Sequence, residues 1–243
     1  MELRGRTAIV TGAGHRVGRA LAIALGRRGM RVVVHYNSTA DGAHETLRAI
    51  EAAGGQGVTV GADLTNVGEI PRVIDAALTH FGAIDVLVNS AAIMVRLPFG
   101  DVQPEQWDQT IDLNLRAPFF LTQAAAPHLR TAKGVVVNIA DLAAFETWPG
   151  YIPHGISKSG VVYITRALAA VLAPDVRVAA IAPGTVLLPE GWSEADAKRL
   201  RQTTPLARDG SPEDVARTML FILDSDYLTG ETIIVDGGRH VRR

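Results

Sequence analysis

The chain has 243 residues, of which 47% are hydrophobic and 20% charged, the composition of a globular protein with a large core. Its 24 Lys and Arg residues nearly balance its 25 Asp and Glu residues, so charge gives no reason to expect nucleic acid or a membrane surface as a partner. The absence of cysteine excludes disulfides, thiolate metal ligands and a cysteine nucleophile. Because the sequence shows neither a signal-peptide pattern nor an apolar run of about 18 residues, we expect a cytoplasmic protein.

The chain begins with a strand, a glycine-rich turn and a helix, which is the layout of a dinucleotide-binding site. The apolar run Thr7–Val10 predicts the strand, and the apolar spacing over Val17–Arg28 predicts the helix. Gly12 allows a tight turn, and Gly14 allows the backbone to approach a pyrophosphate. Gly18 allows the helix to pack close to the strand.

Strand-like and helix-like segments alternate along the rest of the chain. Further strands are expected at Arg31–Tyr36, Gly57–Gly61, Asp85–Asn89, Gly134–Ile139, Arg177–Ala182 and Thr232–Val235. Further helices are expected at Asp41–Ala53, Val67–Phe81, Gln106–Leu129, Ile156–Leu172, Ser193–Gln202 and Pro212–Leu223. Most of these strands are continuous Val, Ile and Ala runs, as in a parallel sheet that is covered on both faces. The pattern predicts an α/β protein, a single-domain doubly wound Rossmann fold over residues 1–243 with a seven-stranded parallel sheet.

The end of the second strand indicates which nicotinamide dinucleotide binds. An NAD site usually has Asp or Glu there, but this chain reads His35-Tyr36-Asn37-Ser38 and has no acid before Asp41. His15 and Arg16 add positive charge in the glycine turn, which suits the 2′-phosphate of NADP(H). The alternative is that both are solvated turn residues.

Ligands of open parallel sheets bind at the carboxyl ends of the strands. The candidate cofactor residues at those ends are Gly12, Gly14, His15, Arg16, Val17, Gly18, His35, Tyr36, Asn37, Ser38, Asp63, Leu64, Asn89, Ser90, Ala91, Pro183, Gly184 and Val186. The resemblance described next adds Lys158, on a predicted helix, as a further cofactor residue. Asp63 either bonds the adenine amino group or caps the next helix.

These motifs resemble the short-chain dehydrogenase/reductase family over essentially the full length. Thr11-Gly12 with Gly18 is similar to the family's Thr-Gly-x-x-x-Gly-x-Gly turn, with Arg16 in place of the middle glycine. The other matching segments are Asn89-Ser-Ala-Ala92, Pro183-Gly184 beside the nicotinamide, Thr229-Gly230 and Val235-Asp-Gly-Gly238. The resemblance implies an oxidoreductase that uses a nicotinamide cofactor.

Within the family, the chain is most similar to pteridine reductases and dihydromonapterin reductases. They share the arginine of the glycine turn, the His-Tyr end of the second strand, an aspartate at the position of Asp141, and the ending Asp236-Gly-Gly-Arg-His240. This resemblance implies hydride transfer from NADPH to a carbonyl or to a pterin C=N bond. A 3-oxoacyl group or a simple ketone is the alternative substrate.

The resemblance implies catalytic roles for Asn114, Asp141 and Lys158, but histidine replaces the family's tyrosine in the segment Tyr151-Ile-Pro-His154-Gly-Ile-Ser-Lys158. The spacing of four residues places His154 and Lys158 on one helix face. A neutral imidazole is a poor proton donor, so the replacement keeps a second class open, a protein that binds NADP(H) without turnover. Tyr151 either supplies the missing phenol or packs at the entrance of the helix.

The expected substrate residues are Met94, Asp141, Tyr151, Leu188 and Trp192. Pteridine reductases have an aromatic ring at the position of Met94, and Trp192 is the residue that could stack in its place. We expect a small-molecule substrate, no metal ion, and a homotetramer or dimer that pairs through Gln106–Leu129 and Ile156–Leu172.

Overall fold

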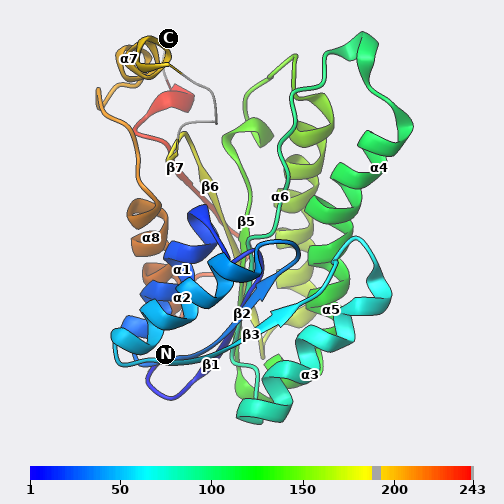
Figure 1. Cartoon of the computed structure of the whole chain (residues 1–243), viewed down its shortest axis with the longest axis vertical. Coiled ribbons are helices and arrows are strands. Elements are labelled where there is room, and N and C mark those ends of the chain that lie inside the picture. Colours follow the sequence, from blue (N-terminus) through cyan, green and yellow to red (C-terminus); the bar gives the residue numbers. More distant parts are fainter. Residues whose placement is uncertain (188–192, 242–243) are drawn as a thin grey trace.

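The computed structural model describes residues 1–187 and 193–241. Its strands form one seven-stranded sheet in the order β3-β2-β1-β4-β5-β6-β7, and every pairing is parallel (Figure 1). The strands are β1 (Thr7–Val10), β2 (Arg31–Tyr36), β3 (Gln56–Gly61), β4 (Val86–Asn89), β5 (Val135–Ile139), β6 (Arg177–Pro183) and β7 (Thr232–Val235). The chain reverses its direction of travel across the sheet between β1 and β4, which is where a doubly wound sheet binds its ligand. The predicted fold class is confirmed.

Helices cover both faces of the sheet (Figure 1). One layer consists of α1 (Arg16–Arg27), α2 (Ala40–Ala52) and α8 (Pro212–Asp224), and the other of α3 (Ile70–Phe81), α5 (Ala117–Ala132) and α6 (Ile152–Leu172). The remaining helices are α4 (Pro104–Ile111), which leads into α5, and α7 (Glu194–Thr203), which lies at the top of Figure 1.

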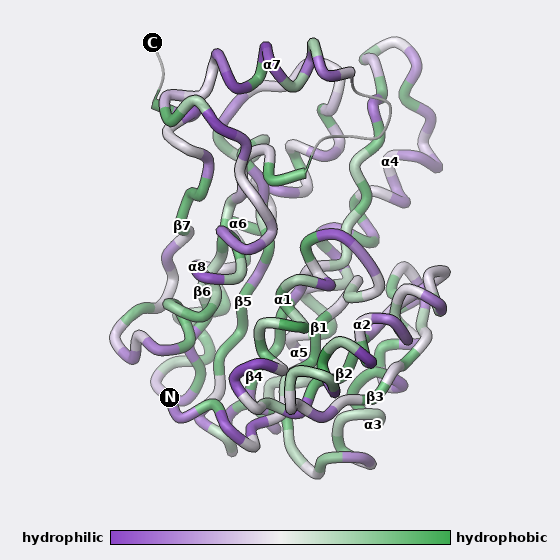
Figure 2. The backbone as a smooth tube through the Cα atoms, turned by 60° about the vertical axis from the view of Figure 1, so that its left-hand side comes forward, coloured by the Kyte–Doolittle hydropathy of each residue, from purple (hydrophilic) through white to green (hydrophobic). Residues whose placement is uncertain are grey.

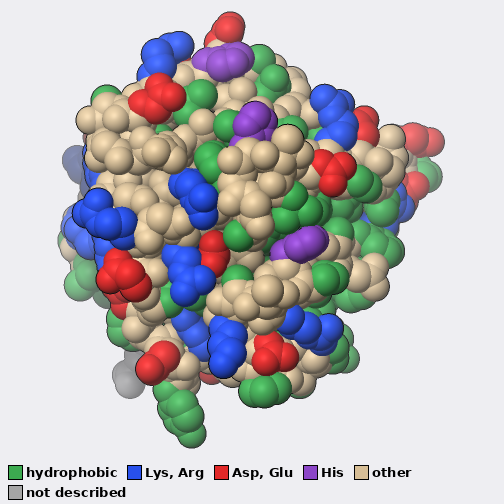
Figure 3. Space-filling view, turned by 90° about the horizontal axis from the view of Figure 1, so that it is seen from below, with side chains coloured by type: hydrophobic (Ala, Val, Ile, Leu, Met, Phe, Trp, Pro, Cys, Tyr) green, Lys and Arg blue, Asp and Glu red, His purple; other side chains and the backbone are tan. Residues whose placement is uncertain are grey.

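The core has two sides because successive strand residues point to opposite faces of the sheet. Ala8 and Val10 pack toward α1 and α8, whereas Ile9 packs toward α3 and α5. Figure 2 shows that hydrophobic residues follow one another along the central strands, whereas hydrophilic residues recur along α7. Acidic and basic side chains are interspersed on the face at the bottom of Figure 1 (Figure 3).

Three predicted helices differ from the observed ones in ways that affect the site. The expected helix Gln106–Leu129 is α4, a π-helical segment at Asp112–Arg116, and α5. The helix α6 begins at Ile152 rather than Ile156, because Pro153 fits the first turn of a helix. The segment Val67–Glu69 is a 3₁₀ turn that precedes α3.

Among the described helices, α6 alone has the length and apolar composition of a membrane span. Its polar side chains His154, Ser157, Lys158 and Thr165 are buried within the fold. This is the environment of a core helix.

Candidate active site

The glycine turn between β1 and α1 is tightly packed. Gly12 has φ +64°, and a Cβ there would lie 2.8 Å from the Cα of Ala91. A Cβ at Gly18 would collide with the carbonyl oxygen of Gly12. The structural reasons given for these two glycines, a tight turn and close helix packing, are therefore confirmed. At Gly14 a Cβ would collide with Thr39 Oγ1, so the residue before α2 also requires a glycine there, and the expected approach of the Gly14 backbone to a pyrophosphate stays a prediction.

Arg16 has an unusual backbone conformation. Its φ is +51°, a region that costs a residue with a side chain roughly 1–2 kcal/mol and that glycine adopts freely. The family motif has glycine at this position. This chain retains a backbone conformation that suits glycine but carries a positively charged arginine side chain there. Arg16 and His15 are both exposed at the start of α1, and Val17 is half-buried.

His35 lies at the end of β2 but does not face outward. Its side chain is 1% exposed, Nδ1 accepts a hydrogen bond from Gly12 N, and Nε2 donates to Ala62 O. Burial lowers its pKa to about 4. With both nitrogens engaged inside the fold, the imidazole has no free atom for a cofactor, which corrects the binding role expected for this side chain.

The neighbours of His35 and the end of β3 are the positions expected to meet the adenosine half of the cofactor. Tyr36 covers Gly61, where a Cβ would lie 3.1 Å from the ring, and Asn37 and Ser38 are exposed. Asp63 Oδ1 accepts from the N–H and the hydroxyl of Thr65, while Asn66 caps the following 3₁₀ turn. The expectation that Asp63 is a helix cap is therefore wrong. Leu64 is 3% exposed and belongs to the core.

Thr11 joins the glycine turn to the segment after β4. Its hydroxyl oxygen accepts hydrogen bonds from the N–H groups of Ser90 and Ala91, at 2.9 and 3.0 Å. Asn89 points inward and donates to Asn138 Oδ1 at 2.8 Å, so its amide braces β4 against β5. Thr11 and Asn138 both belong to segments that resemble the family, but the sequence did not predict that the Thr11 hydroxyl holds the segment after β4 or that Asn138 bonds Asn89.

The end of β6 brings a second turn to the same edge. Gly184 donates its N–H to Val235 O, and a Cβ there would lie 2.8 Å from Asp236 Cβ, so Pro183-Gly184 runs close to the end of β7. Val186 is 9% exposed and packs in the core, which leaves only its backbone for a ligand.

Lys158 and Asp141 meet beside β5. Lys158 is 4% exposed, and its Nζ donates to Ile139 O at 2.8 Å. Burial lowers its pKa to about 8, while the charge of Asp141 opposes that shift. Asp141 lies two residues beyond the end of β5, and its Oδ1 accepts from Ala143 N at 2.7 Å. Oδ2 is directed toward α6.

His154 occupies the space between Asp141 and the segment after β4. Its Nδ1 lies 3.1 Å from Ile93 O, and its Nε2 lies 3.7 Å from Asp141 Oδ2. Nε2 is buried and has no hydrogen-bond partner among the described residues. The i, i+4 placement of His154 and Lys158 on α6 is confirmed, since both are buried on the same side of that helix.

Asn114 belongs to the π-helical segment and is 1% exposed. Its Oδ1 accepts from Ile93 N at 2.9 Å, and its Nδ2 donates to Ile93 O at 2.9 Å and to Ser157 Oγ at 3.1 Å. Asn114, Asp141, His154 and Lys158 therefore form one connected group. The role of Ile93 was missed because a backbone carbonyl leaves no mark in the sequence, and the bond from Asn114 to the Ser157 hydroxyl was not predicted either.

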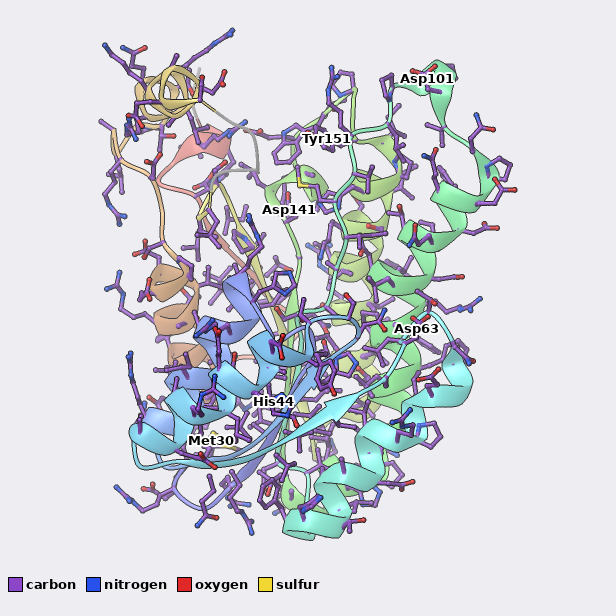
Figure 4. All side chains as sticks on the ribbon, in the orientation of Figure 1. Met30, His44, Asp63, Asp101, Asp141 and Tyr151 are labelled. Atoms are coloured by element: carbon purple, nitrogen blue, oxygen red, sulfur yellow. The ribbon has the colours of Figure 1, made fainter. Side chains whose placement is uncertain are left out.

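The expected substrate residues are only partly placed. Tyr151 immediately precedes α6 and meets the Trp148 ring edge-on at 6.2 Å, which fits the packing alternative. Tyr151 and Asp141 are both labelled in Figure 4, and Met94 is 44% exposed. Leu188 and Trp192 lie outside the described residues.

Two further observations concern the surroundings of this group. Arg239 lies over the Trp148 ring at 5.6 Å and near Glu146 Oε2, which ties the C-terminal segment to the loop after β5. No group of three or more His, Asp or Glu side chains in residues 1–187 and 193–241 is arranged to hold a metal ion.

Known proteins are similar to this chain over nearly its full length. Residues 12–240 match the family described as enoyl-(acyl carrier protein) reductase. The chain is 37% identical to a 3beta-hydroxysteroid dehydrogenase from Eggerthella lenta, with 98% of this chain and 94% of the relative covered. It is 36% identical to a 3-oxoacyl-[acyl-carrier-protein] reductase from Synechocystis sp., covering 97% of each. The crystal structure of the angucycline C-6 ketoreductase LanV with bound NADP is similar at TM-score 0.92 and 29% identity, covering 99% of this chain and 97% of that one. The chain therefore belongs to the short-chain dehydrogenase/reductase family, as its motifs predicted.

Proposed function

We propose that the protein is an NADP(H)-dependent oxidoreductase that interconverts a carbonyl group and a secondary alcohol. The observation that carries the proposal is the group of buried His154 and Lys158 with half-buried Asp141 at the carboxyl end of β5, in which Nε2 of His154 has no partner among the described residues and faces a carboxylate. A buried polar atom without a partner is costly in a purely structural setting and is typical of a site that meets a ligand.

The described residues fit an NADP cofactor. The crowded turn at Gly12 and Gly18 has the form of a dinucleotide loop, and no acid occurs from His35 to Ala40, where an NAD site has its carboxylate. Arg16 retains an unfavourable backbone conformation and adds a cation there. LanV, a structural relative, binds NADP, which supports the same assignment.

The chain's own residues supply the remaining chemistry. When bound, the nicotinamide donates or accepts a hydride. Lys158 places an ammonium in a buried position, where it can hold a ribose hydroxyl and stabilise developing negative charge. His154 Nε2 and Asp141 Oδ2 flank the space where a substrate oxygen gains or loses its proton.

A ketone or its alcohol is the favoured substrate class. The relatives named above are a hydroxysteroid dehydrogenase, a 3-oxoacyl reductase and a ketoreductase, all of which act on such groups. A pterin C=N bond is the second candidate. It is favoured by Asp141 at the position of the family's serine and by Arg16, and disfavoured by exposed Met94, which offers no stacking ring.

The test is NADPH oxidation by the purified protein with cyclic and aromatic ketones, a 3-oxoacyl thioester and a quinonoid pterin. We expect turnover with a ketone, and we expect His154→Ala to bind NADPH normally while losing turnover. Turnover with the pterin alone would move the assignment to the second candidate. NADPH binding with no turnover of any compound would support a binding protein that lacks catalysis.

A further inference from the structure

We propose that His154 is the proton acceptor when this site oxidises a secondary alcohol, and that Asn114 acts through Ile93 to fix the imidazole tautomer that makes this possible. The inference rests on the proposed oxidoreductase function. It identifies the atom that accepts the proton and the residue that fixes the tautomer in which that atom is unprotonated.

The Nδ1 side of the ring determines the tautomer. Nδ1 of His154 lies 3.1 Å from the carbonyl oxygen of Ile93, which can only accept a hydrogen bond. Nδ2 of Asn114 lies 3.4 Å from the same Nδ1, but it already donates to Ile93 O and Ser157 Oγ at shorter distances. Nδ1 therefore carries the hydrogen, and in the neutral ring the lone pair lies on Nε2.

Asn114 holds the carbonyl that selects this tautomer. Its amide contacts both the N–H and the C=O of Ile93, each at 2.9 Å, from a π-helical segment that interrupts the helical path between α4 and α5. Such segments often occur at functional sites. Because Asn114 reaches the imidazole through the Ile93 peptide, it is a positioning residue.

The Nε2 side of the ring faces the reaction space. Nε2 is buried and lies 3.7 Å from Asp141 Oδ2, too far for a direct hydrogen bond. The other oxygen of Asp141 is held by Ala143 N. A hydroxyl placed beside both groups can donate its proton to Nε2, and the carboxylate then stabilises the imidazolium that forms.

The charged surroundings of His154 come from few elements. Asp141 faces it from the loop after β5, and Lys158 lies one turn along α6 with Nζ bonded to Ile139 O. The segment Asp112–Arg116 presents the neutral Asn114, and the loop after β4 presents the Ile93 backbone.

Oxidation of the alcohol breaks two bonds and forms one carbon–oxygen π bond. The O–H bond of the alcohol breaks and its proton passes to His154 Nε2, while the C–H bond breaks and its hydride passes to the oxidised nicotinamide. The carbon–oxygen double bond forms, and the imidazolium later releases its proton to water. A tyrosine must lose its own proton before it can do this work, and an ordinary phenol ionises near ~10, whereas an ordinary imidazole is neutral above ~6.5.

The first test observes the tautomer directly, without turnover. Long-range ¹H–¹⁵N spectra of protein labelled at histidine, with His154 assigned by its loss in His154→Gln, should show a protonated Nδ1 and an unprotonated Nε2 at pH 8. In Asn114→Ala the signals should move toward a mixture of tautomers. A protonated Nε2 and bare Nδ1 in the wild-type protein would overturn the proposal.

The second test compares NADP⁺-dependent oxidation at pH 7 and pH 8 in the wild type and in His154→Tyr, using cyclohexanol or the alcohol of the best ketone. With NADP⁺ saturating at both pH values, so that any loss of affinity through Lys158 does not enter, the wild-type rate should change far less than the rate of His154→Tyr, which should rise up to about tenfold. An equal rise in both proteins would overturn the proposal. Reduction of the ketone by NADPH, measured in parallel, tests the proposed function separately.

Discussion

The Nδ1 atom of His35 accepts a hydrogen bond from the backbone N–H of Gly12 at 3.2 Å, and the Nε2 atom of the same ring lies 3.0 Å from Ala62 O. One buried imidazole therefore ties the glycine turn after β1 to the end of β3. The turn that is expected to hold the cofactor depends on a neutral histidine, because each bond assigns one nitrogen as acceptor and the other as donor.

This arrangement predicts a loss of stability in acid. Burial lowers the pKa of His35 from 6.5 to about 4, so below pH 6.5 the unfolded chain takes up a proton that the folded protein resists. The contribution is fully present above pH 6.5 and is lost as pH falls toward 4, by about 3 kcal/mol in total. Urea unfolding at pH 7.5 and 4.5 should show a smaller drop for His35→Gln than for the wild type. The exposed His44→Gln is the matched control, and an equal drop in all three proteins would refute the role of His35.

Arg16 should separate cofactor affinity from stability. Both Arg16→Ala and Arg16→Gly remove the cation, so each should weaken NADPH binding by about 1–3 kcal/mol and affect NADH far less. Only glycine adopts the positive φ without strain. The free energy of unfolding of Arg16→Gly should therefore exceed that of Arg16→Ala by about 1 kcal/mol. Titration of both cofactors and urea unfolding measure the two effects. Equal losses for NADPH and NADH would contradict the 2′-phosphate assignment.

Loss of the proton from Lys158 should weaken NADPH binding at alkaline pH. Its pKa is lowered to about 8 by burial, so the ammonium is present below that value and is lost as pH rises through it. We therefore expect NADPH affinity, measured by fluorescence titration, to decline between pH 7 and pH 9.5. The decline should disappear in Lys158→Met, which binds weakly throughout. A wild-type affinity that stays constant over this range would show that the ammonium does not hold the cofactor.

The outer face of α5 and α6 should pair two copies of the chain. Phe119 is 38%, Tyr163 72% and Val171 66% exposed, a large amount of apolar surface for two neighbouring helices. Light scattering should show a dimer or tetramer at micromolar concentration, and Tyr163→Asp should dissociate it. Tyr227→Asp, at a fully exposed position on another surface, is the control. A monomeric wild-type protein would refute the expected assembly.

The fold was predictable because a doubly wound sheet leaves a strong pattern. Buried runs such as Val32-Val-Val34 can only be central strands, and Gly12 and Gly18 are required by contacts that no larger residue could make. The shared helix face of His154 and Lys158 was equally predictable from their spacing, whereas the proposed roles of these residues came from the family resemblance.

The parts that were missed depend on backbone geometry. The π-helical segment around Asn114 interrupts an apolar pattern that reads as one continuous helix. The carbonyl of Ile93 could not be predicted as the partner of His154, because any residue provides one. His35 appeared to face the cofactor because it ends a strand, but the side-chain direction that buries it is set by the neighbouring β3 and the glycine turn.

Hydride transfer at a site that contains histidine in place of tyrosine is the proposal that most needs a direct test. The most direct measurement incubates the protein with NADPH carrying deuterium at the transferable C4 position and a reactive ketone, and analyses the alcohol by mass spectrometry. We expect the wild type to form an alcohol that is one mass unit heavier at its carbinol carbon, and His154→Ala to form none. Binding of the labelled NADPH with no deuterium in any product, or undiminished transfer by His154→Ala, would contradict it.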